Sequence, residues 1–263
     1  MVSVSVGTRP RLAGGARCRR VTTTTWDACS GRSGHAGGPT PTPHPHTPTR
    51  RRSVPSKRAL IVVDVQNEYF DGVLQIQHPD RDETLANVVR AIDVADDQGI
   101  PVVLVQHELP EGAPIFAAGS HSWTVHPDVE SRATEAWKRV TKESSSVFAG
   151  TDLAAWLAEQ GVDTISLVGY MTNNCDIATA VSAEELGLEA EVLSDATGAI
   201  HLANEAGKVS AEQLHDVLMV LLHSNFAAVA TTDAWITAAS AGDPLPKSDL
   251  GTSATAGRSV FAG

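Results

Sequence analysis

Cys175 is the residue of this chain best suited to nucleophilic chemistry. It follows an apolar, strand-like run at 164–168 and opens a helix-like stretch at 176–186. A thiol in the first turn of a helix lies beside free backbone N–H groups and the positive end of the helix dipole, which favour the thiolate over the thiol. The alternative is a small buried apolar residue, because free cysteine is among the most buried residue types. Other segments of the sequence distinguish between these two roles.

Polar side chains also follow two other strand-like segments. Asp64, Gln66 and Asn67 come after a continuous run of Leu, Ile and Val, which is typical of a parallel strand covered on both faces. Burying a carboxylate in such a place destabilises the protein unless the carboxylate is paired or has a function. Lys142 ends a second, shorter segment. Because ligands gather at the carboxyl ends of strands in open α/β sheets, we expect Asp64, Lys142 and Cys175 to converge.

The order and spacing of several motifs match a known pattern. The motifs are Asp-x-Gln-Asn at 64–67, Lys-x-x-x-Ser-x-Phe at 142–148 with Gly-Thr-Asp-Leu at 150–153, Val-Gly-x-x-Thr-x-x-Cys at 168–175, and Leu-Gly at 186–187 before a strand ending in Ser-Asp-Ala at 194–196. Over about residues 57–239 the chain resembles the isochorismatase-like cysteine hydrolase superfamily. Any one motif alone would be a weak signal, and their combination makes the resemblance specific.

The resemblance implies roles for three residues. In that family an Asp, a Lys and a Cys act together, and here they would be Asp64, Lys142 and Cys175. A free thiol has a pKa near ~8.5, so Asp64 is expected to act as the base while Lys142 holds its carboxylate. The family also has a cis peptide, here between Tyr170 and Met171, with the amides of Met171 and Cys175 as the oxyanion hole. Without the resemblance, Asp64 and Lys142 could equally form a buried ion pair that takes no part in catalysis.

Further residues are candidates for substrate contacts. They are Gln66, Asn67, Phe70, His107, Glu108, Trp123 and Tyr170. The three that follow the first strand either line the pocket or support its wall. The other four lie in loops or at strand ends, where a packed or solvated residue is the more common alternative.

No metal ion and no cofactor are expected. The nicotinamidase branch of the resembled family binds a metal through Asp and His residues after the first and second strands. Here no His follows Asp64 before His78, and the second strand ends in Val-Gln-His-Glu at 105–108 instead of Asp-Trp-His. Isochorismatases proper cleave a vinyl ether and need no Cys nucleophile. Cys175 therefore favours an amide, imide, ureido or lactam carbonyl as the group attacked.

Charge is unevenly distributed along the 263 residues, whose net charge is −11. Residues 1–58 contain 11 Lys and Arg and one acidic residue, Asp27, for a net charge of +10. The remaining 205 residues contain 9 Lys and Arg and 30 Asp and Glu, for a net charge of −21. An acidic body attracts cations, which favours a cationic small-molecule substrate. Acidic surfaces also serve solubility, so charge alone does not choose the substrate.

Residues 1–56 are rich in Arg, Gly, Pro, Thr and Ser without amphipathic periodicity, so a disordered basic tail is expected. Its Arg50, Arg51 and Arg52 could attract nucleic acid or an anionic membrane. An extension without a function of its own is the simpler interpretation, and neither partner is expected. The chain shows no secretory apolar region and no run long enough to span a bilayer, and its three cysteines form no disulfide framework. These features predict a cytoplasmic protein.

Strand and helix patterns alternate from about residue 57, which predicts the α/β class. The expected architecture is a three-layer α/β/α sandwich around a six-stranded, mainly parallel sheet at 57–239. The segment 107–129 is too interrupted by Pro and Gly for regular structure and is expected to shape a binding site. Residues 240–263 are rich in Gly, Ala and Ser and are expected to form a flexible arm or an intersubunit strap.

Two helices have more specific expectations. One should run from Thr151, as the N-cap, to Gln160. The last helix should carry Leu214, Val217, Leu218 and Leu221 on one face.

Family resemblance suggests a homodimer or homotetramer. Two other kinds of function compete with catalysis. A noncatalytic member of the fold could bind a small ligand or a protein, but it would gain nothing from keeping Asp64, Lys142 and Cys175 together. An oxidation sensor would also use a reactive cysteine. The predicted domain contains no second Cys to resolve an oxidised Cys175, which disfavours a sensor.

Overall fold

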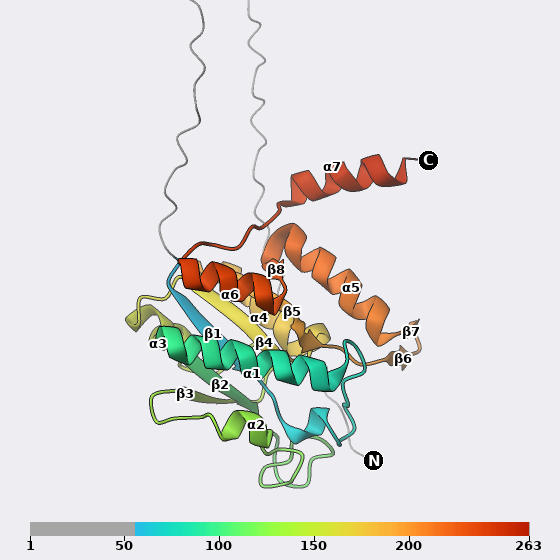
Figure 1. Cartoon of the computed structure of the whole chain (residues 1–263). Helices are drawn as coiled ribbons and strands as arrows, with labels where there is room; N and C mark the ends of the chain where they lie inside the picture. Colours follow the sequence, from blue (N-terminus) through green and yellow to red (C-terminus); the bar gives the residue numbers. More distant parts are fainter. Residues whose placement is uncertain (1–55, 263) are drawn as a thin grey trace, which may run out of the picture. The chain divides into compact units, whose positions relative to one another are not determined.

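The computed structural model describes residues 56–262, so the predicted tail lies outside the described residues except for Ser56. The main sheet has six strands in the order β3-β2-β1-β4-β5-β8, and every ladder is parallel. The strands are β1 (Arg58–Val63), β2 (Val102–His107), β3 (Lys138–Lys142), β4 (Thr164–Tyr170), β5 (Glu189–Gly198) and β8 (Ala228–Ala230). Figure 1 shows the sheet between its covering helices. The predicted six-stranded sheet is confirmed.

Two hydrophobic cores lie on the opposite faces of this sheet. The helices α1 (Arg81–Gln98) and α6 (Thr232–Ala241) cover one face, and α3 (Leu153–Glu159) and α4 (Ile177–Glu185) cover the other. Successive side chains of β1 enter the two cores in turn, with Leu60 and Val62 in one and Ile61 and Val63 in the other. This alternation follows from the two-residue period of a strand, and it explains why β1 is apolar throughout. The predicted three-layer sandwich is confirmed.

The remaining elements connect or extend these layers. They are the short helices η1 (Asn67–Tyr69), α2 (Pro127–Glu130), η2 (Thr172–Asp176) and η3 (Leu222–Phe226), the helices α5 (Ala211–Leu221) and α7 (Leu250–Phe261), and the hairpin of β6 (Leu202–Asn204) and β7 (Gly207–Val209). Apart from the single turn of α2, the segment 108–129 has no helix or strand, as expected. No helix in the described part of the chain has the length and apolar character needed to cross a membrane.

Two helix predictions differ from the structure. The helix predicted from Thr151 begins at Leu153, with Asp152 at the N-cap. The Thr151 hydroxyl donates to the carbonyl of Val147 at 2.7 Å and accepts a longer hydrogen bond, of 3.4 Å, from the backbone N–H of Leu153. Thr151 therefore still contacts the first turn, although the helix begins two residues later than predicted. Residues 250–261 form α7 where a flexible arm is expected, because Asp249 caps this helix by accepting from the backbone N–H of Thr252.

The predicted apolar face of α5 is only partly covered, and α5 is not the last helix. The residues that α5 buries are Ala211 and His215, whereas Val217 is 62% exposed and Leu221 is also exposed. Apolar residues at helical spacing identify an apolar face, but they do not show which other element packs against it. Leu214 and Leu218 are half-buried, so the described residues cover this face of α5 only in part.

Gly169, next to the last residue of β4, fits where no other residue would. Its φ is 108°, and a Cβ added there would lie 2.1 Å from the carbonyl oxygen of Val63 in β1. Gly187, after α4, also has a positive φ, of 72°, but an added Cβ would meet nothing within 4 Å.

We expect Gly169→Ala to destabilise the protein far more than Gly187→Ala. The Gly187 variant carries only the cost of a left-handed conformation, roughly 1–2 kcal/mol. The Gly169 variant must also push β1 and β4 apart, so its total cost should be about 4 kcal/mol or more. Urea unfolding of both variants measures this difference. Equal losses of stability would show that β1 and β4 do not approach each other this closely.

Candidate active site

Four neighbouring strands bring the predicted catalytic residues to one edge of the sheet. Lys142 is the last residue of β3, Asp64 directly follows β1, and Cys175 lies in η2 shortly after β4. Between β3 and β1 runs β2, which ends in His107. Because these strands are parallel, their carboxyl ends lie side by side. The expected convergence of Asp64, Lys142 and Cys175 is present.

The Lys142 ammonium lies at the centre of this cluster. Its Nζ is 2.7 Å from Asp64 Oδ2 and donates to Cys175 Sγ at 3.3 Å. It is also 3.0 Å from His107 Nδ1 and donates to the Ser144 carbonyl at 3.1 Å. The side chains of Asp64 and Lys142 are fully buried, and Cys175 is 1% exposed. A buried charge without a partner is very costly, so the two ions depend on each other.

Asp64 has an unusual backbone conformation. Its φ is 49°, in the left-handed region that Asp tolerates better than most residues. The N–H of Gln66 donates to the Asp64 carbonyl at 2.7 Å, so the chain turns sharply as it leaves β1. Such conformations persist where the surrounding structure over-determines them, and they are common at functional sites.

The turn before Cys175 has the expected peptide geometry. The bond between Tyr170 and Met171 is cis, at the position that the family resemblance implies. The Met171 carbonyl accepts hydrogen bonds from the backbone N–H groups of Asn174 and Asp176, which closes the η2 turn ahead of α4. Cys175 therefore lies at the start of a helix, as expected. The assignment of the Met171 and Cys175 amides to an oxyanion hole remains a prediction.

The protonation state of Cys175 differs from the expectation drawn from the helix dipole. Burial raises the pKa of the thiol, the Asp64 carboxylate raises it further, and Lys142 lowers it. Loss of hydration destabilises the thiolate. This effect is larger than the stabilisation that the Lys142 ammonium and the helix start provide. The thiol is thus protonated at neutral pH. An attack by Cys175 needs a base, and the ligand atoms of Asp64, His107 and Cys175 all lie within 4.8 Å of one another.

The Lys142 amine and the His107 imidazole differ in protonation state. Burial lowers the pKa of Lys142, but Asp64 and Cys175 raise it, and the net shift is upward. Burial lowers the pKa of His107, and the neighbouring Lys142 lowers it further. Lys142 is therefore charged and His107 neutral, so that His107 Nδ1 can accept a hydrogen bond from the ammonium.

Asp64, His107 and Cys175 form a set of atoms that could ligate a metal ion. The Lys142 ammonium, however, contacts all three of them. The positive charge that a metal would supply at this position is already supplied by Lys142, so the donor set does not fit a resident ion. This supports the expectation of a site without a metal, which remains a prediction.

Two of the candidate substrate-binding residues support the wall of the site. The Gln66 side-chain amide donates to the carbonyls of His107 and Trp123, at 2.9 and 2.7 Å, and accepts from the His107 N–H at 2.8 Å. The Asn67 amide donates to Thr124 Oγ1 at 2.8 Å. These bonds hold the loop after β2 against the end of β1. Gln66 has thereby committed its amide to protein partners, which argues against a contact with substrate.

The aromatic candidates also lie mainly in protein contacts. Tyr170 is fully buried, and its hydroxyl shares a hydrogen bond of 2.9 Å with Thr84 of α1. We therefore correct its expected role from pocket lining to core packing. Phe70 packs edge-on against Tyr170, with ring centroids 5.8 Å apart. The indole N–H of Trp123 is buried and has no partner among the described residues.

A pocket of about 340 Å³ opens beside Lys142. Its lining residues are Glu108, Thr141, Lys142, Glu143, Ser144, Ala149 and Gly150. Glu108 is the candidate substrate-binding residue that lines it, and Glu143 adds a second carboxylate that the sequence analysis does not single out. The size suits a small molecule. Two carboxylates favour a cationic group on that molecule.

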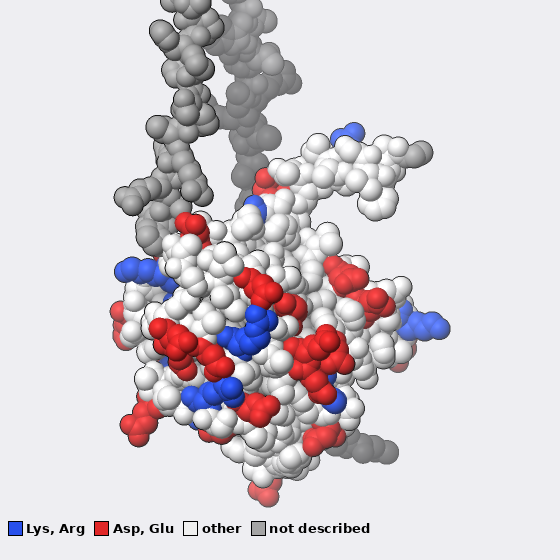
Figure 2. All heavy atoms as spheres, in the orientation of Figure 1, with Lys and Arg blue, Asp and Glu red and all other residues white. Residues whose placement is uncertain are grey.

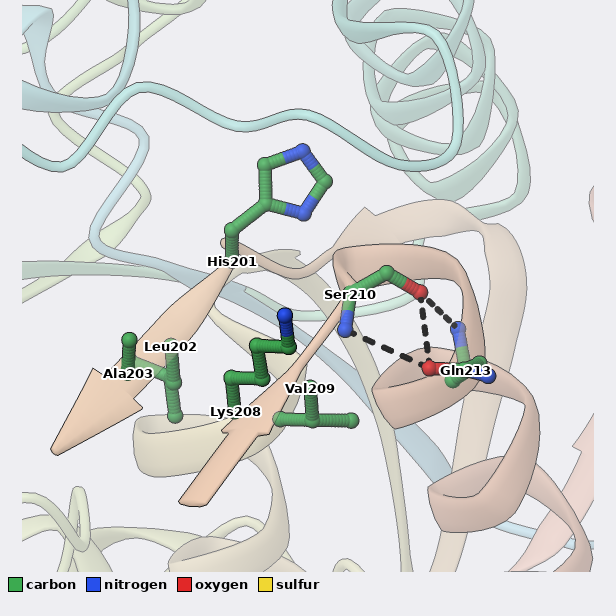
Figure 3. Close-up of a pocket in the computed structure, with 7 residues that line it drawn as sticks. All are labelled: His201, Leu202, Ala203, Lys208, Val209, Ser210 and Gln213. Carbon is green, nitrogen blue, oxygen red and sulfur yellow. Dashed lines mark hydrogen bonds between the residues drawn. The ribbon is translucent and has the colours of Figure 1, made fainter. Parts of the chain in front are cut away.

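A second pocket, of about 470 Å³, lies between the β6–β7 hairpin and the start of α5, as Figure 3 shows. Its lining residues are His201, Leu202, Ala203, Lys208, Val209, Ser210 and Gln213. None of the three predicted catalytic residues lines it. This pocket is therefore separate from the catalytic cluster.

Asp176 lies beside the site and belongs to none of the sequence motifs. Asp176 is fully buried beside Cys175, and neither of its carboxyl oxygens has a hydrogen-bond partner among the described residues. Burial raises its pKa well above the ordinary value, Asp64 raises it further, and Lys142 lowers it. The available signal was helical spacing, since Asp176 precedes the buried Ala180 and Ala183 by four and seven residues.

Two side-chain contacts fix the turn that carries Cys175. Ser145, in the loop after Lys142, donates its hydroxyl to Asn174 Oδ1 at 2.7 Å. On the other side, Thr172 Oγ1 lies 3.1 Å from Nδ1 of His215 in α5. The turn is thus held both from the loop that follows β3 and from α5.

A thiol, a lysine and a carboxylate at the carboxyl edge of a parallel sheet define a site of hydrolase type. Residues 58–234 match the model described as Isochorismatase domain, and the chain belongs to this family of hydrolases. The isochorismatase family protein YddQ of Bacillus subtilis is 33% identical over 181 residues, which are 68% of this chain and 98% of YddQ. A crystal structure from Burkholderia xenovorans LB400 that carries the isochorismatase name has 47% identity and a TM-score of 0.77, covering 80% of this chain and 100% of that one.

Two relatives have names that state an activity. A nicotinamidase/pyrazinamidase of Mycobacterium tuberculosis is 30% identical over 168 residues, which cover 54% of this chain and 87% of the relative. A streptothricin hydrolase of Streptomyces noursei is 33% identical over 134 residues, which cover 49% of this chain and 45% of the relative. Both names belong to enzymes that act on small molecules.

We expect Asp176→Asn to stabilise the protein at neutral pH. A carboxyl whose pKa is raised on folding contributes stability below its unfolded pKa, near ~3.9, and this contribution is lost as the pH rises toward the folded value. Near pH 3 the variant and the wild type should therefore have the same free energy of unfolding. From about pH 4 upward the variant should have the larger free energy of unfolding. Denaturant unfolding as a function of pH measures the difference. Asp97→Asn, at an exposed position, is the control and should leave the pH dependence of wild type unchanged.

We expect Lys142→Met to slow alkylation of Cys175 at pH 8 by roughly tenfold or more, because removing the ammonium leaves the forming thiolate without its buried partner. Lys138→Met is the matched control, since Lys138 begins the same strand but pairs with the exposed Asp152. Mass spectrometry of the Cys175 peptide after iodoacetamide treatment separates this thiol from Cys18 and Cys29. Equal rates in both variants would contradict a role for Lys142 in forming the thiolate.

Proposed function

We propose that the protein hydrolyses a C–N amide bond of a small cationic molecule through a thioester on Cys175. The observation that carries this proposal is the buried Lys142 ammonium in contact with both Asp64 Oδ2 and Cys175 Sγ. A core would not need these three groups together, whereas a thiol nucleophile does need a base and a counter-charge. The reaction requires no cofactor.

The first half of the proposed reaction forms the thioester. Asp64 takes the proton of Cys175 as sulfur attacks the carbonyl carbon, and Lys142 stabilises the thiolate by charge. The carbonyl oxygen becomes an oxyanion, which accepts hydrogen bonds from the amides of Met171 and Cys175. When the C–N bond breaks, Asp64 returns the proton to the leaving nitrogen.

The second half releases the acid. Water attacks the thioester carbon while Asp64 takes one of its protons. The same oxyanion hole receives the negative charge. As the C–S bond breaks, the proton returns to sulfur and restores the Cys175 thiol. The sum is one amide plus one water giving a carboxylic acid and an amine.

Among possible substrates, we favour the streptolidine lactam of streptothricin, a polycationic antibiotic, whose opening would serve antibiotic resistance. Support comes from the carboxylates of Glu108 and Glu143 beside Lys142 and from the net charge of −21 over residues 59–263. It also comes from the partial similarity to a streptothricin hydrolase. Glu108 and Glu143 would bind the cationic part of the molecule while its lactam reaches Cys175.

The second candidate function is an amidase or carbamoyl hydrolase that acts on another small amide. The similarity to a nicotinamidase/pyrazinamidase favours it, because that match extends over more of both chains than the match to the streptothricin hydrolase. A noncatalytic, ligand-binding member of the fold is the third candidate. The same experiment separates all three.

We would incubate the protein and its Cys175→Ser variant with streptothricin, simple amides and carbamoyl compounds without added metal, and follow products by liquid chromatography and mass spectrometry. Streptothricin should gain the mass of one water with the wild type and remain intact with the variant. Glu108→Gln and Glu143→Gln should raise KM for streptothricin about tenfold, the effect of roughly 1.4 kcal/mol of lost attraction. Neither change should alter KM for a neutral amide.

Each other outcome selects a different function. If streptothricin stays intact and a simple amide or carbamoyl compound is cleaved, the hydrolase class stands and the antibiotic is not the substrate. If no compound is cleaved and Cys175 also resists alkylation at alkaline pH, the noncatalytic binding protein is favoured.

A further inference from the structure

His107 is the least buried of the three side chains that contact the Lys142 ammonium. Asp64 and Cys175 are buried, whereas His107, at the end of β2, is half-buried. One of its ring nitrogens lies within 4.8 Å of both Cys175 Sγ and a carboxylate oxygen of Asp64. Glu108, the next residue, lines the pocket beside Lys142. The His107 ring therefore joins the buried cluster to the side that a small molecule can reach.

The contact with Lys142 decides which ring nitrogen of His107 carries the hydrogen. Nδ1 of His107 lies 3.0 Å from Nζ of Lys142. An ammonium group donates hydrogen bonds and cannot accept them, so Nδ1 is the acceptor of this bond. The hydrogen of the neutral ring is then on Nε2. Burial and the neighbouring Lys142 both lower the pKa of His107, which agrees with a neutral ring.

Contacts on other sides hold this ring in one orientation. The Gln66 amide accepts from the backbone N–H of His107 at 2.8 Å and donates to its carbonyl at 2.9 Å. The ring of Phe116 packs against the imidazole, with centroids 4.8 Å apart. Phe116 is buried, and its φ of 49° is uncommon for an aromatic residue, which indicates that tertiary contacts fix its place. The Nε2–H group of His107 is therefore kept in one direction.

This Nε2–H group is free to bind a ligand. Nε2 makes no hydrogen bond to another described residue, and it is not one of their buried polar atoms without a partner. Because it is neither bonded nor buried there, it is accessible. The Lys142 ammonium also donates to the opposite nitrogen of the same ring, and hydrogen bonds in a chain polarise one another. His107 thus presents a polarised and oriented donor beside the Cys175 thiol.

The net charge of the protein does not supply such an orientation. Figure 2 shows acidic side chains spread over the face in view, with Lys and Arg among them. A surface of this kind attracts a cation without fixing which of its bonds reaches Cys175. A hydrogen bond does fix an orientation, because it weakens steeply as its angle departs from linear.

We propose that His107 Nε2–H donates a hydrogen bond to the substrate and selects amides that carry an acceptor beside the scissile carbonyl. The acceptor is an oxygen or an unprotonated nitrogen attached to the atom next to that carbonyl, so it lies three bonds from Cys175 Sγ in the thioester. This inference rests on the proposed attack of Cys175 on an amide. It adds a residue that discriminates between amides and leaves the roles of Asp64 and Lys142 unchanged.

Alkylation of Cys175 by two reagents tests this hydrogen bond without a substrate. The thiolate displaces iodide from both iodoacetamide and iodomethane. Only iodoacetamide brings a carbonyl oxygen, which lies three bonds from sulfur in the product, as the proposed acceptor does. A change in the amount of thiolate alters both rates equally, so it cancels in the ratio of the iodoacetamide rate to the iodomethane rate. Mass spectrometry of the Cys175 peptide measures both rates.

Two variants separate the two nitrogens of His107. In His107→Asn the amide oxygen replaces Nδ1 as the acceptor for Lys142, but no donor remains at the position of Nε2. This variant should lower the rate ratio about fivefold, the effect of one hydrogen bond. In His107→Gln the longer amide places a donor near the position of Nε2, so the ratio should stay close to that of wild type. His126→Asn is the matched control, since His126 is also half-buried against an aromatic ring, that of Phe70, and should keep the wild-type ratio.

The other outcomes overturn the proposed donor. If His107→Asn slows both reagents by the same factor, His107 acts only through Lys142. If the ratio falls equally in His107→Asn and His107→Gln, the loss does not come from the Nε2–H group. A wild-type Cys175 that resists both reagents at alkaline pH would show that no acceptor can lie beside the thiol. Hydrolysis is a separate readout, because a ratio that falls as expected in a protein that cleaves no amide would leave the donor in place and contradict the proposed hydrolysis.

Discussion

The buried ion pair between Lys142 and Asp64 is the interaction on which the site depends. Both side chains are fully buried, with Nζ and Oδ2 2.7 Å apart, so neither ion could exist here without the other. The same ammonium contacts the Cys175 thiol, the His107 imidazole and the Ser144 carbonyl. One charge therefore links the ends of three strands to the nucleophile. Its position also argues against a metal ion among the nearby ligand atoms of Asp64, His107 and Cys175.

Charge balance limits what else this region can hold. With Lys142 and Asp64 both ionised, the cluster is neutral, and a further buried carboxylate would leave it one charge negative. Asp176 is such a carboxyl, without a hydrogen-bond partner among the described residues, and burial and Asp64 raise its pKa. The neutral acid is the form that the site can accommodate. A thiolate at Cys175 would add the same negative charge, which is why the Asp64 carboxylate raises the pKa of this thiol.

The sequence predicts the fold and the meeting of the three candidate catalytic residues because both follow from local rules. Apolar strands with polar ends, repeated in a parallel sheet, must place Asp64, Lys142 and Cys175 at one edge. What the sequence does not predict depends on tertiary contacts. The direction of the Tyr170 hydroxyl depends on Thr84, and the pKa of Cys175 depends on how completely other segments cover it. The sequence pattern shows only which residues are apolar, so it likewise does not predict that one side of α5 is exposed.

The two sides of α5 connect the surface of the molecule with its catalytic edge. On the inner side His215 lies between Thr172 of the nucleophile turn, 3.1 Å from Nδ1, and the Ser194 carbonyl, 3.0 Å from Nε2. On the outer side the same helix exposes Val217 and Val220. A helix that shifts outward would withdraw His215 from Thr172 and loosen the turn that presents Cys175. The contact between His215 and Thr172 therefore joins α5 to the turn that carries Cys175.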